Sequence, residues 1–141
     1  MSYKSLPKSI FSFAPKRFSS GVKSFADKSL DASYYDWENG EIHFSSADMP
    51  RKDQPYMYTR AHELGHKVYS ELPEKQLDIW KTHMENVGKE EGIYVGVKRE
   101  EEEFADAFAR AFGYSEWNLA WGGVVGSPSS VTLVKKLLRI R

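Results

Sequence analysis

The pentapeptide His62-Glu63-Leu64-Gly65-His66 constrains this chain more than any other part of its sequence. Residues four apart on an α-helix lie one turn apart on the same face, so a helix here would bring two imidazoles side by side. Apolar side chains recur along one stripe between residues 56 and 70, which supports a helix. A shuffled chain of this composition would contain H-E-x-x-H in roughly 1% of cases, so a solvated helix face stays an alternative on this motif alone.

Composition narrows the groups that could build a site around these histidines. The 141-residue chain has no cysteine, which excludes disulfides, thiolate ligands and a cysteine nucleophile. It has four histidines, and 20 basic against 20 acidic side chains give a formal net charge of zero. We therefore expect no nucleic-acid partner and, without a long apolar run, no membrane span. A transition-metal site in this chain must use histidine and carboxylate ligands.

The order of the predicted elements indicates an α+β fold in one domain of residues 1–141, with an irregular N-terminal segment at 1–20 and a core at 32–114. Asn39-Gly40 separates two aromatic or β-branched runs, which predicts a hairpin with a type I′ turn. Helical patterns are expected at residues 56–70, 73–88, 98–112 and 129–141. The prediction is a short mixed sheet together with several helices.

Zinc suits the two histidines, because it accepts imidazole and carboxylate ligands and keeps one position open in catalytic sites. Glu63 follows His62 directly and would point toward a water molecule in that open position. Zinc lowers the pKa of such a water to about 7, so Glu63 could take its proton and later pass it to a leaving amine. The pattern therefore predicts hydrolysis of peptide bonds, with one zinc ion per chain as the cofactor.

A catalytic zinc site needs a third protein ligand, and the helix predicted at 98–112 offers candidates. It carries four consecutive glutamates, Glu100–Glu103, which would also suit a solvated helix N-terminus because acidic groups favour the macrodipole there. Glu102 and Asp106 have i, i+4 spacing, so Glu102 could bind the metal while Asp106 hydrogen-bonds the far nitrogen of a ligand histidine. Glu103 is the competing ligand, and we favour Glu102 over it.

Residues 59–66 and 102–108 together resemble the gluzincin metallopeptidases, whose signature is H-E-x-x-H followed by E-x-x-x-D. More narrowly, residues 32–114 resemble the catalytic domain of the anthrax lethal factor family. ImmA/IrrE-type peptidases are a second choice, although they usually carry asparagine in place of Asp106. The resemblance implies a zincin-like fold with an active-site helix and a glutamate helix. The roles it implies are zinc ligands at His62, His66 and Glu102, with Glu63 as the general base.

The lethal factor resemblance also implies a tyrosine that stabilises the tetrahedral intermediate. Tyr94 is the candidate, although it precedes Glu102 by eight residues where the family pattern has seven. Gly92 and Gly96 flank Tyr94 and could absorb the extra residue. The alternative is a tyrosine that packs on the zinc helix.

Two further questions stay open at the level of sequence. The chain could be a non-catalytic zincin-like metal-binding module, such as a phage structural component or a secreted toxin-like effector, because zinc stabilises a fold whether or not catalysis occurs. Glu63 argues against that alternative, since a structural site has no use for it. The first residues lack the apolar segment of a secretory signal, so we expect a cytoplasmic product, with leaderless export or virion packaging left open. The expected partner is a peptide or protein substrate, and the sequence does not define the oligomeric state.

Overall fold

Short strands form where apolar and polar side chains alternate, and four of them make one mixed sheet. The structure is a computed structural model, which describes residues 3–49, 54–91, 97–115 and 127–141. The sheet order is β1-β2-β4-β3, with β2 and β4 parallel and the two outer pairs antiparallel. Ile42 and Phe44 share one face of β4 and are fully buried, so this face carries the hydrophobic core. The strands are β1 (Tyr3–Ser5), β2 (Lys23–Asp27), β3 (Tyr34–Asp36) and β4 (Glu41–Ser45).

The hairpin predicted at Asn39-Gly40 joins β3 to β4, but its turn is longer than expected. Asp36 is the last paired residue of β3, so residues 37–40 form a four-residue loop. Gly40 has a φ of 65°, whereas Asn39 lacks the positive φ that a type I′ turn also requires there. The Asp36 carboxylate accepts hydrogen bonds from the backbone N–H groups of Glu38 and Asn39, which favours the longer loop. The hairpin is therefore confirmed, and the two-residue turn is wrong.

The four long helices predicted from the sequence are all present. α3 continues three residues past Gly88, where we expected it to end, because a glycine inside a helix costs only about 1 kcal/mol relative to alanine. None of the helices in the described ranges combines the length and hydropathy that a bilayer-spanning segment needs. The long helices are α2 (Met57–Ser70), α3 (Glu74–Glu91), α4 (Val97–Ala111) and α5 (Pro128–Leu138). The short ones are η1 (Lys8–Phe11), α1 (Lys16–Ser19) and η2 (Ser46–Asp48).

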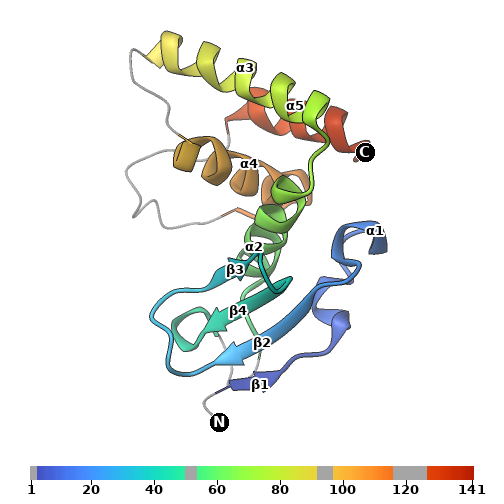
Figure 1. Ribbon diagram of the computed structural model, residues 1–141, viewed down its shortest axis with the longest axis vertical. Helices are drawn as coiled ribbons and strands as arrows, with labels where there is room; N and C mark the ends of the chain where they lie inside the picture. Colours follow the sequence, from blue (N-terminus) through green and yellow to red (C-terminus); the bar gives the residue numbers. More distant parts are fainter. Residues whose placement is uncertain (1–2, 50–53, 92–96, 116–126) are drawn as a thin grey trace.

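Helix α2 runs between the sheet and the other three long helices (Figure 1). It contacts β3 on the sheet side and α4 on the helical side, and α4 in turn packs on α5. One hydrophobic core joins Leu6 and Phe18 near the N-terminus to Leu64 of α2, Phe108 of α4 and Leu138 of α5. The predicted α+β fold with a small mixed sheet is confirmed, and its core also draws on residues on both sides of 32–114.

Gly65 allows α2 and α4 to cross at close range. A Cβ atom at this position would lie 2.8 Å from Cα and 3.0 Å from the carbonyl oxygen of Ala105. It would also lie 3.1 Å from Cβ of Phe108. Backbone atoms cannot move away by a rotamer change, so a larger residue would push the two helices apart. Glycine at this position of the pentapeptide therefore sets how closely α4 approaches the two histidines.

We expect Gly65→Ala to destabilise the protein, because overpacking against a backbone forces the helices to shift at a cost of about 1–3 kcal/mol. This loss should exceed the gain of about 1 kcal/mol that alanine brings as a better helix former. Urea unfolding of the two proteins without zinc measures the difference. A variant that is as stable as the parent would contradict the close crossing of α2 and α4.

Candidate metal centre

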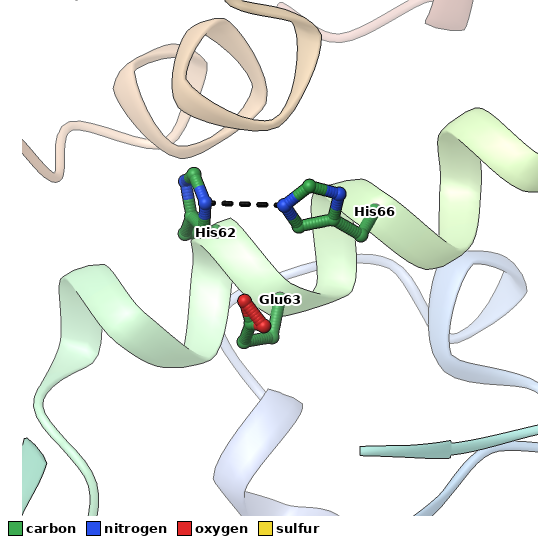
Figure 2. A group of neighbouring side chains, drawn as sticks. All are labelled: His62, Glu63 and His66. Carbon is green, nitrogen blue, oxygen red and sulfur yellow. Dashed lines mark hydrogen bonds between the residues drawn. The ribbon is translucent and has the colours of Figure 1, made fainter. Parts of the chain in front are cut away.

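Two imidazole nitrogens meet on the side of α2 that faces α4. His62 and His66 are one turn apart, and their Nε2 atoms lie 3.2 Å from each other (Figure 2). The rings meet edge to face, with their centroids 4.8 Å apart. The two side chains are only 18% and 12% exposed. The pair therefore lies in the contact between two helices and does not form a solvated helix face.

Glu102 of α4 faces both of these histidines. One of its carboxylate oxygens lies 3.2 Å from Nε2 of His62, and the other lies 3.3 Å from Nε2 of His66. The two Glu102 oxygens thus lie about as close to the histidine nitrogens as these nitrogens lie to each other, at 3.2 Å. Tetrahedral zinc with bonds of about 2.0–2.1 Å places neighbouring ligand atoms ~3.3 Å apart. Each neighbouring pair among His62, His66 and Glu102 thus has the spacing of two zinc ligands, and these three residues could hold a zinc ion.

Glu103, the competing ligand candidate, points to a different part of the molecule. It is 2% exposed, and its Oε2 accepts a hydrogen bond from Oγ of Ser130 at 2.7 Å. The same oxygen accepts the backbone N–H of Ser127 at 3.3 Å, at the start of α5. Oγ of Ser130 also lies 2.8 Å from Nε2 of His83. The structure therefore brings Glu102 to the histidine pair and places Glu103 in the contact between α4 and α5.

Glu63 lies on the same turn of α2 and is almost fully buried. Its ligand atom and those of His62 and His66 all lie within 4.8 Å of one another, so these groups could hold a metal ion. Its side chain Oε2 has no hydrogen-bond partner among the described residues. Burial raises the pKa of Glu63 and outweighs the opposing effect of the two histidines. A buried carboxylate with an unpartnered oxygen is more typical of a functional group than of a structural one.

The charges of Glu102 and His66 are coupled. Burial opposes protonation of His66, but Glu101 and Glu102 outweigh it and raise the pKa of His66 to about 10. Burial also opposes ionisation of Glu102, but the two histidines outweigh it and lower the pKa of this carboxyl. Without zinc, the site therefore holds an imidazolium beside a carboxylate at neutral pH. These groups therefore already favour a positive charge between them. A zinc ion that bound here would replace the proton of His66.

Sequence reasoning missed two groups that contact the outer nitrogens of the histidines. Nδ1 of His62 lies 3.2 Å from the phenolic oxygen of Tyr58, which donates a 2.6 Å hydrogen bond to Oδ1 of Asp106. Asp106 was expected to bond a ligand histidine itself, and the structure shows Tyr58 bridging the two. Nδ1 of His66 lies 3.6 Å from Oε2 of Glu101. Tyr58 precedes His62 by four residues, so the helical spacing that pairs the histidines was also the signal for this tyrosine.

The other two histidines of the chain lie apart from this centre, and the candidate Tyr94 lies outside the described residues. Tyr94 falls within residues 92–96, which the structure does not describe. His43 of β4 is stacked between Phe25 and Tyr34, with ring centroids 5.1 Å away on each side. His83 of α3 contacts Ser130. In the described ranges, the histidines of the candidate centre are therefore His62 and His66.

Comparisons with protein families, with curated proteins and with solved structures find no match to this chain. The case for its function therefore rests on these residues and their geometry.

Proposed function

We propose that this chain is a zinc-dependent peptidase of the gluzincin type, which hydrolyses peptide bonds in a peptide or protein substrate. The observation that carries the proposal is the convergence of His62, His66 and Glu102, whose ligand atoms lie 3.2–3.3 Å apart between two helices. Glu63 adds a buried carboxylate on the same turn of α2. These residues occur in the two segments that resemble the gluzincin motifs.

Each side chain has a distinct role in this proposal. His62, His66 and Glu102 would hold the ion, because two imidazoles and one carboxylate form a known ligand set of catalytic zinc. The bound zinc would act as a Lewis acid on the scissile carbonyl and make water a better nucleophile at neutral pH. Glu63 would accept the proton of the attacking water and transfer it to the leaving amine. Tyr94 is the proposed stabiliser of the oxyanion, as the family resemblance implies.

The burial of Glu63 favours catalysis over a purely structural zinc module. Leaving a buried carboxylate oxygen without a partner costs about 1–3 kcal/mol of stability, or more when the group is charged. A structural site would need the three ligands but would gain nothing from this cost. A general base gains from it, because a raised pKa brings its proton affinity closer to that needed at neutral pH.

Cleavage of a diverse peptide library by the zinc-loaded protein tests the proposal. We expect new termini that are absent when zinc is removed by a chelator and that return when zinc is restored. The same assay with Glu63→Gln separates cleavage by this site from cleavage by a contaminating peptidase. Zinc binding without any Glu63-dependent cleavage would contradict the peptidase proposal and favour the non-catalytic module.

Zinc binding should strengthen as the pH rises. His66 must lose its proton to bind zinc, and its pKa of about 10 in the zinc-free protein means that protons compete at every pH below that value. Between pH 6 and pH 8 we expect the apparent affinity to rise by at least about tenfold per pH unit. Titrations against a competing chelator of known pH dependence measure this slope. A pH-independent affinity would contradict the assignment of His66 as a ligand.

A further inference from the structure

We infer that Tyr58 is a positioning residue, which fixes the tautomer of His62 and thereby sets the affinity of the centre for zinc. The inference rests on the zinc site of the proposed function and assigns a role to a residue outside both motifs. It starts from the contacts of one phenolic oxygen, which lies 3.2 Å from Nδ1 of His62 and 2.6 Å from Oδ1 of Asp106.

The hydrogen count of these three groups defines the direction of each bond. A tyrosine has one hydroxyl hydrogen, and Tyr58 donates it to Asp106. Toward His62 the phenolic oxygen can therefore only accept, so Nδ1 of His62 must carry the hydrogen of the bond between them. In a neutral imidazole the other nitrogen then keeps its lone pair. Nε2 of His62 is the atom that faces His66 and Glu102, so this tautomer is the one that binds a metal.

Contacts on α4 hold the phenol in place. Asp106 is 3% exposed, and its second oxygen accepts a 2.9 Å hydrogen bond from Nε of Arg110. The Tyr58 ring also stacks on the His62 ring, with centroids 5.4 Å apart and planes 30° apart. Asp106 lies one turn after Glu102, so a single helix carries both a proposed zinc ligand and the carboxylate that accepts the Tyr58 hydroxyl. The contacts that lead from Asp106 through Tyr58 to His62 are called the relay below. The orientation of His62 is therefore tied to the helix that supplies Glu102.

Tyr58→Phe keeps the ring and removes only the hydroxyl group, so it tests the relay directly. We expect the zinc dissociation constant to rise by about 10–100-fold, the usual cost of losing a hydrogen bond to the outer nitrogen of a ligand histidine. Tyr56→Phe is the matched control, because it removes the same hydroxyl group two residues earlier, from a side chain that is 50% exposed. Competition with a chelator measures both variants, and the control should bind zinc like the parent.

The relay also predicts a coupling that a merely structural role would not show. In the parent, Asp106→Asn should weaken zinc binding, because it disturbs the acceptor of the Tyr58 hydroxyl. In the Tyr58→Phe background the same change should have little further effect, since the connection to His62 is already lost. Fully additive losses in this double-mutant cycle would overturn the relay.

Nitrogen NMR of the zinc-free parent at pH 8 provides a readout that depends on neither zinc nor the folding of a variant. We expect His62 to carry its hydrogen on Nδ1, and a hydrogen found mainly on Nε2 would overturn the inference. Zinc binding by Tyr58→Phe within twofold of the parent would overturn it as well. Failure of the parent to bind zinc would instead remove the proposed function, and the NMR result would still decide the tautomer.

Discussion

Replacement of Glu63 by glutamine is expected to reduce zinc-dependent peptide hydrolysis by about 10²–10⁴-fold, the range that a positioned general base contributes. Glutamine has nearly the same shape as glutamate but cannot accept the proton of the attacking water. The structure places Glu63 beside His62 and His66 as a buried group with an unpartnered oxygen. The change should therefore affect the chemical step and leave the three zinc ligands intact.

The zinc content of Glu63→Gln is the control that makes this result interpretable. We expect the variant to hold as much zinc as the parent, so that its lost activity cannot be attributed to lost metal. Glu85→Gln makes the same chemical change at an exposed position on α3 and should retain full activity. Hydrolysis that continues unchanged in Glu63→Gln would contradict the role of Glu63 as the base.

The second large effect is expected at Glu102. Glu102→Gln removes the anionic ligand that faces both histidines and should weaken zinc binding by more than about 100-fold, because even the loss of a supporting hydrogen bond costs about 10–100-fold. Competition with a chelator measures the loss of zinc affinity. At limiting zinc, peptide hydrolysis should fall together with the zinc affinity. The geometry makes this expectation specific, since the two carboxylate oxygens lie 3.2 Å and 3.3 Å from the two Nε2 atoms.

The neighbouring glutamate provides the matched control. Glu103→Gln makes the same change one residue further along α4, but its side chain contacts Ser130 and Ser127 of the α5 start. We expect this variant to bind zinc with nearly the parent affinity. If Glu103→Gln lost zinc and Glu102→Gln kept it, the assignment of the third ligand would be reversed.

The sequence predicted the helices well because each carries a strong local pattern. α2 and α4 present long apolar stripes, and none of their observed bounds differs from the expected one by more than one residue. The pattern was less informative where a side chain of one element changes the local geometry. Asp36 bonds the backbone of the following loop and lengthens the hairpin, and α3 continues through Gly88 because one internal glycine costs a helix little. The Asp36 bonds span only two and three residues, so the aspartate itself was a local signal for the longer loop.

The candidate site was predictable where spacing along one helix places the residues. The pairs His62 with His66 and Glu102 with Asp106 each follow from the helical repeat. The choice between Glu102 and Glu103 depends on which side of α4 faces α2, and the sequence of α4 alone does not give that orientation. The link from Tyr58 to Asp106 joins residues that are 48 positions apart, so it depends on how α2 and α4 cross. The sequence pattern of either helix alone does not predict how the two helices cross.

The most direct test of the central claim is the zinc content of the purified protein. After equilibrium dialysis against buffered zinc, elemental analysis of the parent and of the variant with both His62 and His66 replaced by alanine gives the number of ions per chain. We predict one zinc per parent chain and none in the double variant. A parent that retains no zinc, or a double variant that retains as much as the parent, would contradict a metal centre at these residues.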